Sequence, residues 1–172
     1  MSSRLVVVLS IRVLRLLTKL NLLIGAHIVA LLVASLVAEP WVMRALGVPP
    51  TSFNSRLFIG MRLIMVIGIC SIPFVHFVLT RLLMFVETVR TGNPFAAANA
   101  HRFQMIAWAL LALGALNLVV RAVAASVSSP AVPLHVGEGY SFALWLVVLL
   151  LFVLARAFED GARMREELEG TV

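Results

Sequence analysis

The sequence predicts an all-α fold, a four-helix transmembrane bundle whose helices extend into the cytoplasm, and three observations support this prediction. Hydrophobic residues make up 62% of the 172-residue chain and charged residues only 13%, and the mean hydropathy is +1.05. A soluble domain of this length has too much surface to hide so many apolar side chains. The apolar residues also form four long stretches without the alternation that barrel strands need. We therefore expect the chain to be a single integral membrane domain, residues 1–172.

Each apolar stretch is long enough for a membrane-spanning helix, which needs about 20 apolar residues. The four spans are expected at residues 20–38, 58–80, 104–127 and 141–157. The loops that join the first span to the second and the third to the fourth are short and contain proline. They leave little room for an extracellular domain.

Basic residues predict the orientation, because cytoplasmic loops carry an excess of arginine and lysine. The opposite loops hold only Arg44 and Arg56. The predicted inner side holds ten basic residues: Arg4, Arg12, Arg15, Lys19, Arg81, Arg90, Arg102, Arg156, Arg163 and Arg165. We therefore expect both termini and the central loop to be cytoplasmic. Arginine outnumbers lysine thirteen to one, which suggests a GC-rich bacterial genome and hence a bacterial inner membrane.

The helices are expected to continue past the membrane on the cytoplasmic side. The second is predicted to run on to about Val89 and to stop at Gly92, a residue that suits a left-handed helix C-terminus. A new helix is expected from Pro94, so the pair forms a protruding hairpin. Residues 4–19 contain no helix breaker, and they either lie flat on the inner leaflet or extend the first helix.

The C-terminal tail after Phe158 is also expected to be helical, with Glu159 and Arg163 forming a favourable pair one turn apart. Together with the hairpin, it would extend the bundle into the cytoplasm with exposed charge. This extension either contacts a partner or is simply a solvated helix end.

Small and polar residues inside the spans are expected to mediate helix packing. Alanines recur every fourth residue from Ala26 to Ala38, a spacing that lets another helix approach closely. Asn21 and Asn117 are expected to form hydrogen bonds between helices, and Arg121 to pair with an outer glutamate, Glu39 or Glu138. The second span also contains Gly60, Gly68 and Pro73, the last of which is expected to kink its helix.

The sequence contains none of the short motifs typical of hydrolases, metalloenzymes or nucleotide-binding enzymes. We therefore expect no enzyme activity and assign no catalytic, metal-binding or cofactor-binding residue. Cys70 stands alone, which excludes an internal disulfide. His27 and His76 lie in the cytoplasmic halves of their spans and leave two alternatives, haem ligation or a proton relay. The high pI reflects topology and anionic lipid headgroups, and we expect no direct nucleic-acid binding.

Two segments together carry a resemblance. The central loop reads Glu87-Thr-Val-Arg-Thr-Gly-Asn-Pro-Phe, followed by three alanines and Asn99-Ala-His-Arg102. The C-terminal segment, 158–172, reads Phe-Glu-Asp-Gly-Ala-Arg-Met-Arg-Glu-Glu-Leu-Glu-Gly-Thr-Val. These motifs resemble an uncharacterised bacterial membrane family, domain of unknown function 2975, and the resemblance covers most of the chain.

The resemblance implies a small four-helix membrane protein without established enzyme activity. Members of that family are often encoded beside a short helix-turn-helix regulator, which implies that the membrane protein tethers or signals to it. The residues that match the family pattern are Gly92, Pro94, Phe95, Asn99, Arg102, Gly161 and Glu166. They either contact a partner or only lock the hairpin to the tail, with Asn99 and Arg102 bonded to tail carboxylates or carbonyls.

The leading interpretation is therefore a non-enzymatic inner-membrane protein that binds or tethers a cytoplasmic helix-turn-helix transcriptional regulator. One alternative is an oligomeric subunit of a small transporter or channel, since four helices alone make a thin pore. A second alternative is a haem-binding redox membrane protein, which rests only on the two histidines. The partners expected are the lipid bilayer and the regulator, with a homo-oligomer as an option.

Overall fold

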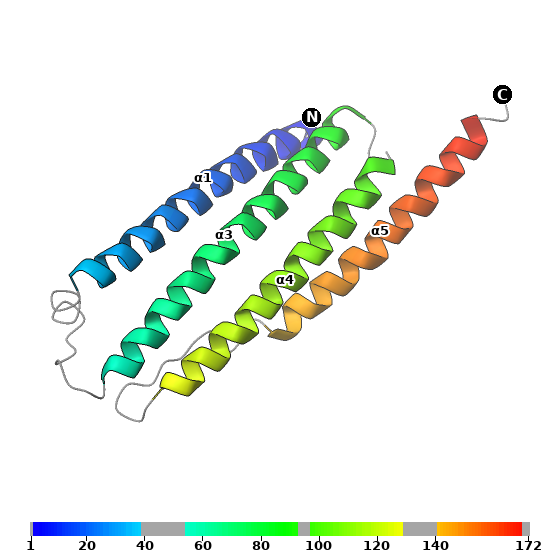
Figure 1. Ribbon diagram of the computed structural model, residues 1–172. Coiled ribbons are helices and arrows are strands. Elements are labelled where there is room, and N and C mark those ends of the chain that lie inside the picture. The colour runs from blue at the N-terminus through cyan, green and yellow to red at the C-terminus, as the bar shows by residue number, and fades with distance from the viewer. Residues whose placement is uncertain (1, 39–53, 93–96, 129–140, 170–172) are drawn as a thin grey trace.

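The computed structural model describes residues 2–38, 54–92, 97–128 and 141–169. Within these residues all the regular structure is helical, which confirms the predicted all-α class (Figure 1). The helices are α1 (Ser2–Val37), α3 (Asn54–Arg90), α4 (Ala97–Val127) and α5 (Ser141–Glu169).

The four helices form an open row rather than a ring around a common axis. Among the described residues, α1 packs on α3, α3 on α4 and α4 on α5, and the two outermost helices do not touch. Successive helices run antiparallel (Figure 1). At one end of the row α1 begins, α3 ends, α4 begins and α5 ends. We call this end the hairpin end.

Among the described residues, three helical segments are long and apolar enough to cross a membrane: Val6–Val37, Leu57–Arg90 and Ala98–Val127. Few of their side chains are buried, and the exposed ones include many large aliphatic residues, which is the arrangement that a lipid solvent favours. The protein is therefore a membrane protein of helical type.

The helix α5 is less apolar along its described length than the other three. Its uninterrupted apolar run extends from Phe142 to Ala155, about 21 Å at about 1.5 Å per residue, and Arg156 follows. A hydrocarbon core is about 30 Å thick. The fourth crossing thus remains a prediction, although the helix itself is present.

The N-terminal segment extends the first span. Helix α1 continues without a break from Ser2 through Leu20 to Val37, so the alternative in which residues 4–19 form a separate surface helix is not adopted. Ile11 is buried against the neighbouring helix, as expected for a segment that continues to pack.

The contact between α1 and α3 is fixed by two polar bonds. Asn21 donates from Nδ2 to the carbonyl oxygen of Ile72 at 3.1 Å, which confirms its predicted interhelical bond. Near the opposite end, the Arg62 guanidinium donates to the hydroxyl of Ser35 at 3.2 Å and to its carbonyl. A cation inside the span is thus stabilised by a hydrogen-bonded partner on the next helix.

The alanine stripe of α1 is exposed over its first half. Ala26 and Ala30 are exposed, whereas Gly25 is buried against Ile72. The predicted close approach of another helix to this stripe stays a prediction for Ala26 and Ala30, whereas Ala34 and Ala38 are half-buried.

The core lies between α3, α4 and α5 towards the hairpin end. Its buried members are Val78, Phe103, Ile106, Ala109 and Ala155. Three phenylalanines, one from each helix, meet there: the ring of Phe103 lies 4.7 Å from that of Phe85 and 5.1 Å from that of Phe158. This contact holds the start of the C-terminal tail against the α3–α4 hairpin.

Candidate functional site

The candidate site is the hairpin end, where α3 and α4 are locked together by a buried amide. Asn99 is completely buried, and its Oδ1 accepts a hydrogen bond from Arg102 Nη1 at 2.6 Å. The hydroxyl of Thr88 on α3 lies 3.1 Å from the same oxygen. Because a buried polar group is costly without partners, this cluster fixes the two helices relative to each other.

The guanidinium of Arg102 also reaches across to α3. Its Nη1 lies 3.4 Å from both the carbonyl oxygen of Met84 and the hydroxyl of Thr88. The predicted bond from Arg102 to a tail carboxylate or carbonyl is thus not formed, since its partners within the described residues belong to α3 and α4. Arg102 serves the hairpin, and aromatic contact secures the tail.

The turn after α3 has the predicted left-handed glycine. Gly92 has φ of +82°, its N–H donates to the carbonyl of Val89, and the N–H of Thr91 donates to that of Glu87, both at 3.1 Å. A Cβ at Gly92 would meet nothing within 4 Å, so its backbone conformation, and not space, is what favours glycine.

The other predicted site residues are only partly described. Pro94 and Phe95 lie outside the described residues, as does the predicted helix start at Pro94; the described α4 begins at Ala97. Gly161 is half-buried in α5. Glu166 belongs to the same helix, but its side chain lies outside the described set.

Thr88, Phe103 and Phe158 join the site without having been predicted as site residues. Thr88 and Phe158 stand inside the two segments that carry the family resemblance, but threonine in a helix and phenylalanine in an apolar helix are too common to be singled out. Only the spatial contact between α3, α4 and α5 reveals their role.

Four arginines, one on each helix, lie within about 8 Å of one another along the helix axes near this end. Arg102 and Arg156 flank the contacting rings of Phe103 and Phe158, and Arg81 lies one turn from Phe85. On α1, Arg15 lies about 15 Å from the Gly25–Ile72 contact and Arg81 about 14 Å on α3, so the two are level. We call Arg15, Arg81, Arg102 and Arg156 the arginine belt.

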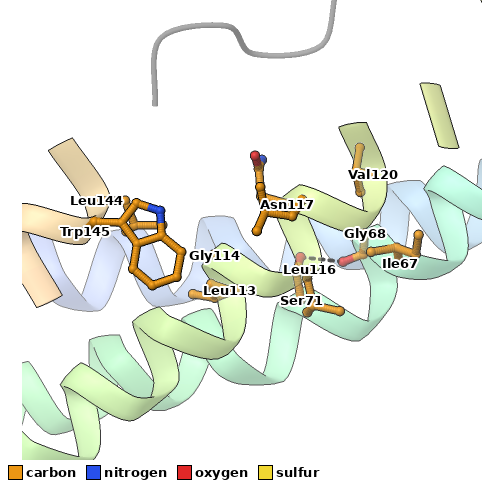
Figure 2. A pocket seen from close by; sticks show the side chains of 11 residues that line it. Ile67, Gly68, Ser71, Leu113, Gly114, Leu116, Asn117, Val120, Leu144 and Trp145 are labelled. Atoms are coloured by element: carbon orange, nitrogen blue, oxygen red, sulfur yellow. Dashed lines mark hydrogen bonds between the residues drawn. The ribbon is translucent and has the colours of Figure 1, made fainter. Parts of the chain in front are cut away.

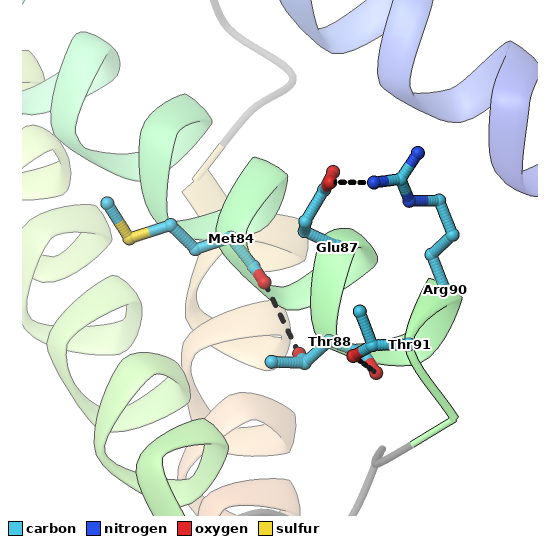
Figure 3. Close-up of polar contacts among 5 residues, drawn as sticks. All are labelled: Met84, Glu87, Thr88, Arg90 and Thr91. Carbon is cyan, nitrogen blue, oxygen red and sulfur yellow. Dashed lines mark hydrogen bonds and ion pairs between the residues drawn. The ribbon is translucent and has the colours of Figure 1, made fainter.

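The surface beyond the arginine belt combines exposed ion pairs with exposed apolar side chains. Glu87 pairs with Arg90 on the last turn of α3 (Figure 3), and Arg163 pairs with Glu167 at 3.3 Å on α5. The predicted pairing of Glu159 with Arg163 is not adopted. Instead Glu159 lies 3.3 Å from Arg156, which also contacts Asp160 at 3.7 Å.

A cavity of about 310 Å³ lies nearer the opposite end, between α3, α4 and α5 (Figure 2). Its walls are mostly apolar, with Gly68, Gly114 and Trp145 among them. The hydroxyl of Ser71 is bonded to its own helix at the carbonyl of Gly68. The amide of Asn117 is exposed and forms no hydrogen bond within the described residues, so its predicted interhelical bond was wrong.

The two histidines of the spans lie at different depths. Because Gly25 is level with Ile72 and the helices are antiparallel, His27 and His76 are separated by about 9 Å along the helix axis. His27 is exposed, and Nδ1 of His76 is buried without a hydrogen-bond partner among the described atoms. This spacing does not favour a haem held between the two imidazoles.

The outer pairing predicted for Arg121 involves Glu39 or Glu138, which lie outside the described residues.

Comparison with known proteins places the chain in a family. No curated protein and no solved structure matches it. The family model described as "Protein of unknown function (DUF2975)" matches residues 41–172, which include α3, α4 and α5 with the whole hairpin lock and its aromatic contact. The match covers most of the sequence, and the chain therefore belongs to the family of domain of unknown function 2975.

Proposed function

We propose that this protein is a non-enzymatic protein of the bacterial inner membrane that tethers a cytoplasmic helix-turn-helix transcriptional regulator through its hairpin end. In this proposal both termini and the hairpin face the cytoplasm, and α5 supplies a fourth crossing. The observation that carries it is a rigid, charged surface that extends past the arginine belt on α3, α4 and α5.

The rigidity of this surface supports a binding role. Asn99, Thr88 and Arg102 fix α3 against α4, and the rings of Phe103 and Phe158 fix α5 against both. A surface that is already ordered loses less conformational freedom on binding. The family motif then acts indirectly, because it holds the contact surface in place while the exposed residues meet the partner.

The charges on this surface are available to a partner. The Glu87–Arg90 and Arg163–Glu167 pairs are solvent-exposed, with side chains 41–81% accessible. Exposed pairs of this kind contribute little to stability, about 0–1 kcal/mol. A partner can therefore replace them at small cost, and complementary charge would speed its association.

The non-enzymatic part of the proposal is supported by how polar groups are used inside the spans. Asn21, Ser35 and Arg62 form bonds between helices, and Ser71 bonds to its own helix. These are packing roles. The transporter and channel alternative expects polar side chains along one continuous path instead, and no observation on the described helices favours it.

The experiment is a pull-down of the helix-turn-helix regulator encoded beside this gene, with the full-length protein in detergent. Charge reversal at Arg90→Glu and truncation before Arg163 are each expected to lower the recovered regulator at least tenfold. Arg90→Lys, which keeps the charge, is the matched control and should bind normally. Full recovery with both the reversal and the truncation would refute the proposal, provided that each variant elutes as the unaltered protein does.

A further inference from the structure

The open row leaves the outer edge of α1 without a neighbouring helix among the described residues. The α1 edge is defined by exposed aliphatic residues at alternating spacings of three and four: Val6, Leu9, Val13, Leu16, Leu20 and Leu23. This is the spacing of a helix–helix seam. The inner face of α1, which includes Ile11 and Asn21, is already occupied by α3.

Part of the α1 edge extends beyond the arginine belt. Val6 and Leu9 are 62% and 63% exposed, and both lie further toward the hairpin end than Arg12 and Arg15. Exposed leucine inside the bilayer needs no explanation, because lipid covers it. The same exposure on a helix that continues straight past the basic residues points to a protein surface that covers it.

The outer edge of α5 has a corresponding set of residues. The α5 edge consists of exposed positions opposite the α4 contact: Leu146, Leu149, Val153, Ala157, Asp160 and Met164. Met164, like Leu9, lies beyond the arginine belt and is 60% exposed. The inner side of α5, with Ala155 and Ala162, is buried.

The two edges carry opposite charge near the hairpin end. The first turns of α1, residues 2–19, contain four basic residues and no acidic one, a net charge of +4. The end of α5, residues 156–169, contains three arginines and five carboxylates, a net charge of −2. Glu159 and Asp160 pair with Arg156 of their own helix, and their side chains remain more than half exposed.

The charges also lie at matching depths. Arg15 and Arg156 both belong to the arginine belt, so Arg12, which flanks the α1 edge next to Val13, and Asp160 on the α5 edge are each within about 6 Å of it along their helices. Two copies of the chain in the same membrane, with the same orientation, would therefore place the basic α1 edge beside the acidic α5 edge without any shift along the membrane normal.

We infer that copies of this chain associate head to tail, with the α1 edge of one protomer packed on the α5 edge of the next. A symmetric pairing of two α1 edges would bring Arg12 and Lys19 of both copies together, which like-charge repulsion disfavours. A head-to-tail contact leaves one free edge at each end, so it closes into a ring or continues as a row. This inference stands independently of the proposed regulator.

The test is cross-linking between two single-cysteine proteins of different size in a Cys70→Ala background. One carries Val13→Cys on the α1 edge and the other Ala157→Cys on the α5 edge, both next to the arginine belt. Mixed in one membrane, they should form the heterodimeric cross-link, whereas each alone should not cross-link to itself. Leu149→Cys, on the α5 edge but about 12 Å away along the helix, is the matched control and should react far less with Val13→Cys.

Charge exchange then separates a specific contact from random collision. Adding Arg12→Glu to the first protein or Asp160→Arg to the second should each reduce the heterodimeric product at least threefold. Combining both changes should restore it, because the ion pair is rebuilt with its signs exchanged. The inference is overturned if Val13→Cys cross-links to itself as well as to Ala157→Cys, or if the mixed product does not exceed the Leu149→Cys control.

Discussion

Asn99 is the residue on which the hairpin end most depends. Its side chain is fully buried, and its carbonyl oxygen is shared by Arg102 on its own helix and Thr88 on the preceding one. A single amide thereby joins two helices and holds Arg102 in place. The described residues of the motif thus fix the positions of the helices, and the proposed partner contacts belong to more exposed neighbours.

Replacing Asn99 should destabilise the fold more than its size suggests. In Asn99→Leu the Arg102 guanidinium loses its shortest described acceptor and the contact with the half-buried Thr88 hydroxyl is broken, which we expect to cost about 1–3 kcal/mol. Thermal unfolding in detergent micelles measures the loss. Gln104→Leu, an exposed position on the same helix, is the control and should change the melting temperature little. Equal shifts for the two variants would contradict the role assigned to Asn99.

Helices α3 and α4 approach closely where α3 begins and α4 ends. A Cβ on Gly60 would come within 2.7 Å of both Cγ atoms of Val127. A Cβ on Gly68 would meet only Cδ1 of Ile28, at an ordinary 3.7 Å. The two glycines therefore have different reasons to be present, although both lie in the same helix.

This difference predicts opposite effects of the same substitution. Gly60→Ala should destabilise the protein by about 1–3 kcal/mol, because stiff, β-branched Val127 cannot turn aside without a helix shift. Gly68→Ala should be neutral or stabilise by up to about 1 kcal/mol, since alanine favours helix more than glycine does. Chemical unfolding of the two variants in micelles compares them directly. A loss of stability at Gly68→Ala as large as that at Gly60→Ala would show that space does not govern these positions.

At the level of elements, hydrophobic stretch length was enough to predict where the helices lie, and basic residues and Gly92 were enough to predict how far they continue. Which residues contact each other across the helices was not predictable from the sequence. The alanine stripe of α1 identified a face but not its neighbour, and Asn117 gave no sign that its amide would face a cavity. Arg102 was assigned to the tail because charge pairing suggested a carboxylate, whereas its acceptors are a threonine, an amide and a backbone carbonyl. The spacing of residues in the sequence reveals helical periodicity. Which helices contact each other depends on their order in the row, and the sequence does not show that order.

For the whole molecule, the arginine belt defines one boundary of the apolar region. From Arg15 to Val37 along α1 is about 33 Å, close to the thickness of about 30 Å expected for a hydrocarbon core. The proposed topology predicts that the remaining turns at the hairpin end lie outside the lipid. All four helices contribute to this end of the row (Figure 1).

The orientation of the molecule is testable at two positions. In a Cys70→Ala background, Thr91→Cys at the tip of α3 should react with a membrane-impermeant maleimide only in inverted vesicles, because the positive-inside bias places the hairpin end in the cytoplasm. Ser126→Cys, exposed near the end of α4, should react only from outside right-side-out cells. Labelling of Thr91→Cys from outside intact cells would reverse the proposed topology.

The open row has a consequence for the surrounding lipid. Among the described residues no helix packs on more than two others, so both broad faces of the row carry exposed aliphatic side chains. In a bilayer, acyl chains cover these faces, and each helix is then contacted by lipid along much of its length. A change of lipid composition should consequently act on every helix of the molecule, and not on an outer shell alone.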